Sequence, residues 1–169
     1  MSIIQKRVTE PSYPRQFSAD TGASTTGVSV GTSVIPLISI RPKATFNSVI
    51  NRGVILPSHF ECLSKDQPVI LRVIYNGTLT GSSFTSADSN SIAEYDTSAI
   101  SITGGEKIST AYVSSGGSSR GSTVHEIDAQ FPLTLDADGN NPKTLTLVAA
   151  VLNASSSEVW ASWEWKEIG

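Results

Sequence analysis

The sequence predicts an all-β protein: an antiparallel two-sheet β-sandwich of the jelly-roll type with an extended N-terminal arm. From Val34 onward, apolar side chains recur with a period of two, as they do in strands that bury one face. The candidate strands are short and are separated by turn signals rich in Gly, Asn and Asp. No stretch of a dozen residues shows a convincing 3.6-residue period. About eight strands without crossover helices favour a jelly roll first and an immunoglobulin-like sandwich second.

The predicted arm covers residues 1–30. Basic residues alternate in it with prolines and aromatic residues: Lys6, Arg7, Pro11, Tyr13, Pro14, Arg15 and Phe17. A polar tract over 21–27 follows. Because this composition cannot bury a face of its own, the segment is expected to be extended. The β-sandwich domain is then expected to cover residues 31–169.

Three segments within the domain alternate most clearly. Their core faces are expected to carry Val69, Leu71, Val73 and Tyr75 in the first, Leu145, Leu147, Ala149 and Val151 in the second, and Val159, Ala161, Trp163 and Trp165 in the third. Shorter strands are expected over 34–40, 46–50, 59–63, 100–103, 107–114 and 131–136. Two long polar loops, 77–91 and 114–123, are expected to interrupt the pattern.

Charged residues make up only 16% of the 169 residues, against a typical value of about 25%. The surface is therefore expected to consist largely of Ser, Thr, Asn and Gly, which costs little to pack against another protein. A net charge of −3 without clustered Lys and Arg argues against nucleic acid or an acidic membrane as partner.

Cys62 is the only cysteine, so no intrachain disulfide can form. No signal peptide or membrane span is recognised, so synthesis in a cytoplasm is expected.

Two patterns suggest catalysis, and both have simpler interpretations. Residues 117–121 match G-x-S-x-G around Ser119, but that motif requires a strand-to-helix turn, and β-branched residues follow it up to His125. Acidic pairs such as those of glycosidases occur at Glu94 with Asp96, and at Glu126 with Asp128. Charges on solvated strand edges explain these pairs without a reaction. We therefore expect a protein that is not an enzyme.

Two groups of residues suggest a metal site. The segment 136–141 offers oxygen ligands in the style of a calcium loop, but it lacks the third acidic ligand and the closing Glu. A β-turn with Gly139 at positive φ explains it better. His59 and Cys62 would lie on opposite faces of a strand, which argues against zinc. No metal or cofactor is expected, and Cys62 is expected to be a small buried residue.

The three tryptophans lie on two different faces of the last expected strand, because their positions alternate along it. Trp163 and Trp165 share the core face, whereas Trp160 lies on the opposite face and is a candidate for contact with a partner. The residues that we expect to contact partners are Arg7, Tyr13, Arg15, Phe17, Arg120 and Trp160.

The sequence RVIYNGTLTGSSFT over 72–85, Glu-Tyr-Asp over 94–96 and ITGGEKI over 102–108 form a recognisable series, and the ending WASWEWKE over 160–167 adds to it. Over residues 33–169 the chain thereby resembles structural proteins encoded in tailed-bacteriophage genomes. The resemblance carries no motif of functional residues.

The resemblance implies a virion component, such as a capsid decoration (cement) protein that binds the major capsid protein or other virion proteins as a homotrimer on the capsid surface. In that case the N-terminal arm would lie across capsid subunits and add main-chain hydrogen bonds to exposed strand edges. The alternative is a neck, tail or head-fibre accessory protein whose loops bind a host glycan.

Overall fold

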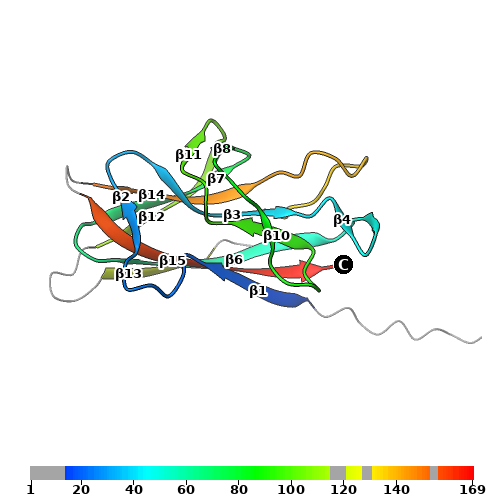
Figure 1. The fold of residues 1–169 in the computed structure, drawn as a ribbon, viewed down its shortest axis with the longest axis horizontal. Coiled ribbons are helices and arrows are strands. Elements are labelled where there is room, and N and C mark those ends of the chain that lie inside the picture. Colours follow the sequence, from blue (N-terminus) through cyan, green and yellow to red (C-terminus); the bar gives the residue numbers. More distant parts are fainter. Residues whose placement is uncertain (1–13, 115–120, 127–130, 153–155) are drawn as a thin grey trace, which may run out of the picture.

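The computed structural model describes residues 14–114, 121–126, 131–152 and 156–169. Every regular element in these residues is a β-strand, and all strand pairs are antiparallel. Two larger sheets face each other in a sandwich-like arrangement and enclose one hydrophobic core (Figure 1). The prediction of an all-β protein is confirmed.

The first sheet has the order β1-β15-β6-β13, with β2 also paired to β15. Its strands are β1 (Arg15–Asp20), β2 (Val28–Val30), β6 (Val54–Ser64), β13 (Gly121–Glu126) and β15 (Ser157–Ile168). β15 is the central strand, because β6 pairs with one of its edges while β1 and β2 follow each other along the other edge.

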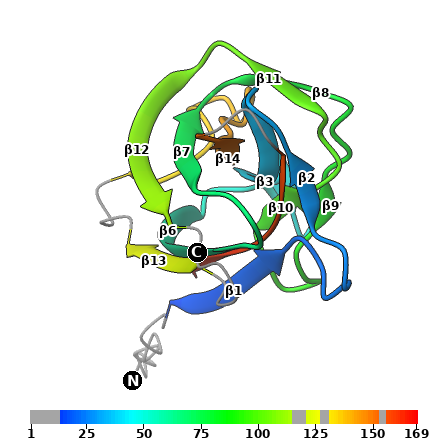
Figure 2. The same cartoon turned by 90° about the vertical axis from the view of Figure 1, so that its left-hand side faces the viewer.

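The second sheet has the order β12-β7-β14-β3-β10-β9. Its strands are β3 (Ile35–Pro42), β7 (Val69–Tyr75), β9 (Thr85–Ser86), β10 (Ala93–Asp96), β12 (Glu106–Val113) and β14 (Leu145–Val151). Two small ribbons are formed by β4 (Thr45–Phe46) with β5 (Val49–Ile50), and by β8 (Thr78–Thr80) with β11 (Ser101–Thr103). Figure 2 shows β12, β7, β14 and β3 on one side of the core and β13 and β1 on the other.

The expected core faces are confirmed. In β15 buried and more exposed residues alternate, and Trp163 and Trp165 are fully buried. β14 is buried on both faces, because it lies in the middle of its sheet between β7 and β3. Its polar residue on the outward face, Thr146, shares a hydrogen bond of 2.9 Å with Ser39 of the adjacent strand. This bond satisfies two buried hydroxyl groups at once.

Two expected strands differ in the structure. Residues 46–50 do not form one strand: Asn47 and Ser48 have φ angles of 50° and 64°, which turns the chain between β4 and β5 as in a tight hairpin. Within 131–136, only Leu133 makes an isolated bridge, to Ile55. The polar loop expected over 77–91 contains β8 and β9, and the loop expected over 114–123 ends at β13.

The structure places part of the predicted arm inside the first sheet. β1 and β2 pair with β15, and Ala19 on β1 is buried in the core. The boundary expected after residue 30 therefore does not match the edge of the folded unit, because alternate residues of this polar segment do bury one face. Residues 1–13 lie outside the described residues, and for them an extended arm stays a prediction.

Candidate functional site

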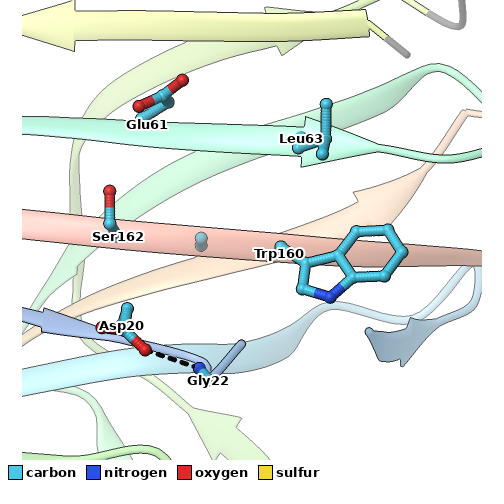
Figure 3. Close-up of a pocket in the computed structure, with 7 residues that line it drawn as sticks. Asp20, Gly22, Glu61, Leu63, Trp160 and Ser162 are labelled. Atoms are coloured by element: carbon cyan, nitrogen blue, oxygen red, sulfur yellow. Dashed lines mark hydrogen bonds between the residues drawn. The ribbon is translucent and has the colours of Figure 1, made fainter. Parts of the chain in front are cut away.

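A shallow hollow of about 210 Å³ lies on the outer face of the first sheet (Figure 3). It is lined by Asp20, Gly22, Glu61, Leu63, Trp160, Ala161 and Ser162. These residues come from β1 and the turn after it, from β6 and from β15. The hollow therefore joins three strands that lie far apart in the sequence.

The pairing of the strands arranges the lining side chains in two rows. Ser162 on β15 lies opposite Asp20 on one side and Glu61 on the other, which forms a polar row across the three strands. Trp160 lies opposite Leu63, which forms a neighbouring apolar row. Side chains directly opposite each other in an antiparallel pair lie on the same face of the sheet. The hollow thus has one polar half and one apolar half, as Figure 3 shows.

The turn between β1 and β2 fixes the indole of Trp160. Its Nε1 donates a hydrogen bond of 2.9 Å to the carbonyl oxygen of Ser24. A Cβ atom at Gly27 would approach two indole carbons to 3.0 Å and the Val159 carbonyl oxygen to 2.7 Å. Thr21 anchors the start of the turn through two hydrogen bonds of 3.0 Å with the backbone of Ala161. The indole is therefore held in one orientation by the chain behind it.

The hollow carries two carboxylates, those of Asp20 and Glu61. Asp20 Oδ1 accepts a hydrogen bond of 2.7 Å from the Gly22 N–H. In the part of the chain that the structure describes, the ion pairs join Arg41 to Glu94, His59 to Glu164, and Lys65 to Glu158. Within those residues no cation neutralises Asp20 or Glu61. The hollow is an anionic surface beside an aromatic ring.

Cys62 lies next to this site but faces the core. Burial, and secondly the charge of Glu61, raise the pKa of its thiol from 9.0 to about 12. A thiol with this pKa stays protonated near neutral pH and is a poor nucleophile. The prediction that Cys62 is a small buried residue is confirmed.

The structure separates the residues that the sequence proposed for partner contact. Trp160 lies on the outer face, as its parity predicts, and is half-buried in the hollow. Arg15 is exposed at the other end of β1, where its Nη1 donates a hydrogen bond of 3.2 Å to Asn90. Phe17 requires a correction, because it points toward the core and stacks on Trp165 with ring centroids 6.5 Å apart. Arg7, Tyr13 and Arg120 lie outside the described residues.

The candidate calcium loop is a turn. The Asp136 side chain accepts a hydrogen bond of 2.6 Å from the Asn140 N–H, and Gly139 has a φ of 75°. Among the described residues, no group of three or more His, Cys, Asp or Glu could hold a metal ion. His59 and Cys62 lie on opposite faces of β6, as expected.

The acidic pair on β10 has a structural role. Glu94 pairs with Arg41 at 2.8 Å. Asp96 is buried and accepts hydrogen bonds from the N–H groups of Ser83, Ser98 and Ala99. These bonds order the chain on both sides of β10. Asp128, the side chain of Glu126 and the residues around Ser119 lie outside the described residues.

Asp20 and Glu61 were not recognised from the sequence as parts of a site. Asp20 fell in the predicted arm, and Glu61 had no signal beyond its outward parity. Only the register of β1 and β6 against β15 brings them together.

No helix in the described residues has the length and apolar character to cross a membrane.

The strands define an all-β protein with a sandwich-like core and a shallow hollow on the outer face of its first sheet. Compared with known proteins, the chain matches no family model, no curated protein and no solved structure.

Proposed function

We propose that this chain is a non-enzymatic structural protein of a tailed-phage virion, which decorates the capsid surface and reinforces it by binding the major capsid protein. The observation that carries the proposal is the order of the strands. The likeness to phage structural proteins over residues 33–169 supports it further. A homotrimer is part of the proposal, and a chain with only 16% charged residues suits extensive protein contacts.

The strand order supports a jelly roll. One sheet contains β2 (with β1), β15, β6 and β13, and the other contains β3, β14, β7 and β12. Along the chain, every step between these eight strands crosses to the opposite sheet except the step from β7 to β12. Such an order is that of two Greek keys in a double-sheet jelly roll, an architecture found in viral capsid and lectin domains. Since a fold hosts many functions, the order supports the class of protein and no particular partner.

An exposed strand edge gives this protein a means of attachment. Within the described residues, β1 pairs only with β15, which leaves its other edge without a strand partner. Unpaired N–H and C=O groups on such an edge can bind an extended segment of another chain. β1 also carries the exposed side chain of Arg15.

The decisive experiment locates the protein in particles. We expect purified virions to contain it at a fixed ratio to the major capsid protein, and the recombinant chain to co-sediment saturably with capsids that lack it. Those capsids should then withstand a higher temperature. The arm is tested by deleting residues 1–13 only, because a deletion of 1–30 would remove β1 and β2. Absence of the chain from virions would contradict the proposal.

A neck, tail or head-fibre accessory protein that binds a host glycan is the second candidate. One observation favours it: Trp160 is half-buried in a surface hollow, where an indole can stack on a sugar. Glycan-array binding that is lost in Trp160→Ala would support this function. Binding that is unchanged in this variant would exclude the hollow as a glycan site.

A further inference from the structure

Arg72 lies on the outer face of the second sheet, and among the described residues its guanidinium has no acceptor. Its neighbours on β7, Leu71 and Val73, belong to the core, so Arg72 faces the other way. The residue is half-buried, and its Nε is buried without a hydrogen bond. The remaining arginines that the structure describes each donate to a carboxylate or a backbone carbonyl oxygen: Arg15, Arg41 and Arg52.

The strands beside Arg72 offer it no carboxylate. β12, β7 and β14 are neighbours in the second sheet (Figure 2), and their register places Thr110 opposite Arg72 on one side and Val148 on the other. Lys107 on β12 adds a second cation to this face. The other surrounding side chains on the face are apolar or carry a hydroxyl group: Ile70, Ile74, Tyr112, Thr146 and Ala150.

The acidic residue of these three strands, Glu106, does not serve Arg72. It lies opposite Tyr75, whose ring packs against the core, and therefore belongs to the other face of the sheet. An arginine next to a carboxylate on its own sheet is the usual arrangement in this protein, as Arg41 and Glu94 show at 2.8 Å. The outer face around Arg72 thus carries positive charge that these strands leave unpaired.

Large apolar side chains are exposed on the same face. Tyr112 is 63% exposed and lies one row from Arg72 on the adjacent strand. Leu152 is 51% exposed, and its N–H donates to the Pro68 carbonyl oxygen, which continues the pairing of β14 with β7. Since Pro68 and Arg72 are four residues apart along one strand, the face extends over about 13 Å between them. An extended segment of about five residues has this length.

A carboxylate between apolar groups complements this face. Because Nε is buried, a ligand meets the two terminal nitrogens of Arg72, which can donate in parallel to both oxygens of one carboxylate. A phosphate has the same geometry, but nucleic acids and acidic membranes select clusters of cations, and the chain has a net charge of −3. Arginine and tyrosine with few charges around them are typical of the centres of protein interfaces.

We infer that the Arg72 face, formed by Arg72, Lys107, Tyr112 and Leu152, binds a partner protein through an Asp or Glu side chain that apolar residues flank. The carboxylate pairs with the terminal nitrogens of Arg72, and an apolar neighbour packs on Tyr112. This inference rests on the proposed function as a protein-binding component and names the chemistry of the partner. Burying Nε without a hydrogen bond costs the isolated chain stability, so Arg72 is better explained by binding than by folding.

The first test separates a binding residue from a structural one. Arg72→Met keeps a long unbranched side chain and removes the unsatisfied Nε, so the melting temperature of the isolated chain should stay the same or rise. Arg41→Met is the matched control, because Arg41 is half-buried on the same sheet and is paired with Glu94. Its melting temperature should fall. An equal fall in both variants would assign Arg72 to the fold and overturn the inference.

The second test measures binding to the full chain. The probe is the peptide acetyl-Ser-Leu-Glu-Leu-Ser-amide, and its matched control carries Gln in place of Glu. Binding is followed by the backbone amide signals of Thr110 and Tyr112 in ¹H–¹⁵N spectra. We expect the Glu peptide to shift both signals saturably and the Gln peptide to bind about tenfold more weakly. Raising the salt concentration should weaken the Glu peptide only.

Variants divide the contact into its charged and apolar parts. Arg72→Met should remove the difference between the two peptides, because neither then meets a guanidinium. Tyr112→Ala should weaken both peptides to the same extent. Lys166→Met is the control, because Lys166 is an exposed cation on β15 of the first sheet, and its loss should leave binding unchanged.

Four further results would overturn the inference. They are equal binding of the two peptides, no shift at about 20 mM Glu peptide, an equal shift with inorganic phosphate, and signals that move with protein concentration alone. The third would identify a general anion site, and the fourth would identify a second copy of the chain as the occupant. Because both tests use the isolated chain, a chain that binds the Glu peptide but is absent from virions would contradict only the proposed function.

Discussion

The indole Nε1 of Trp165 donates a hydrogen bond of 2.8 Å to the carboxylate of Glu167, and both side chains are buried. The same carboxylate accepts hydrogen bonds of 2.6 Å from the Ser91 hydroxyl and 2.8 Å from the Ile92 N–H. It therefore connects the end of β15, in the first sheet, to the start of β10, in the second. A buried carboxylate with three donors holds these two parts of the sandwich together.

Replacing Glu167 should destabilise the protein strongly. Glu167→Ala leaves three donors without their acceptor, and we expect the free energy of unfolding to fall by about 3 kcal/mol, as measured by urea denaturation. Glu167→Gln keeps one acceptor oxygen and should cost less. Glu164→Ala, on the outer face of the same strand, is the control and should change stability by no more than about 1 kcal/mol. Equal losses in Glu167→Ala and Glu164→Ala would show that the buried network does not stabilise the fold.

Gly27 should tolerate no side chain. In Gly27→Ala the new Cβ would meet the Val159 carbonyl oxygen at 2.7 Å and the indole of Trp160 at 3.0 Å. The turn must then move away, at a cost of about 1–3 kcal/mol. Gly31→Ala is a matched control, because nothing lies within 4 Å of a Cβ there. We expect the melting temperature to fall in the first variant only, together with a shift of the Trp160 indole signal.

The Cys62 thiol should make stability depend on pH at alkaline values. Its pKa is about 12 in the folded protein, against 9.0 for the reference thiol. Between these values the unfolded chain loses the proton while the folded protein keeps it. Stability from this group is therefore complete below pH 9 and falls by about 1.4 kcal/mol per pH unit above it.

The measurement compares wild type with Cys62→Ala in urea denaturation from pH 8 to 10.5. Other groups titrate in both proteins, so the difference between the two curves isolates the thiol. We expect the free energy of unfolding of wild type, relative to that of Cys62→Ala, to fall as the pH rises above 9. Parallel curves would contradict the raised pKa. Native protein should also react slowly with a thiol reagent at pH 8, and unfolded protein rapidly.

Parity in the sequence predicts the core well where a strand has one solvated face. It assigns Trp163 and Trp165 to the core and Trp160 to the surface, as the structure has them. It is less informative for β14, where Thr146 and Val148 on the second face are also buried. A central strand covered on both faces gives an almost continuous apolar run, which parity does not divide.

The candidate site depends on the pairing register of distant strands, which the sequence alone does not show. Asp20, Ser162 and Glu61 form a row only because β1 and β6 take one register against β15. Strand register is set by long-range packing and turn geometry, and a shift by one residue would turn these side chains inward. The local alternation of residues specifies which side chains face outward, but it does not specify which of them become neighbours on adjacent strands.

The assignment of β1 to the sandwich, against the arm predicted from composition, can be tested within one strand. Ala19 faces the core and is 5% exposed, whereas Ser18 faces solvent opposite Glu164. Ala19→Lys would bury a charge beside Trp163, and we expect a loss of at least 2 kcal/mol in the free energy of unfolding, on the order of other buried-charge substitutions. Ser18→Lys introduces the same side chain opposite a carboxylate and should change stability by less than about 0.5 kcal/mol. Urea denaturation of both variants measures the difference. If β1 were a detached arm, the two substitutions would be equally harmless, because neither residue would contact the core.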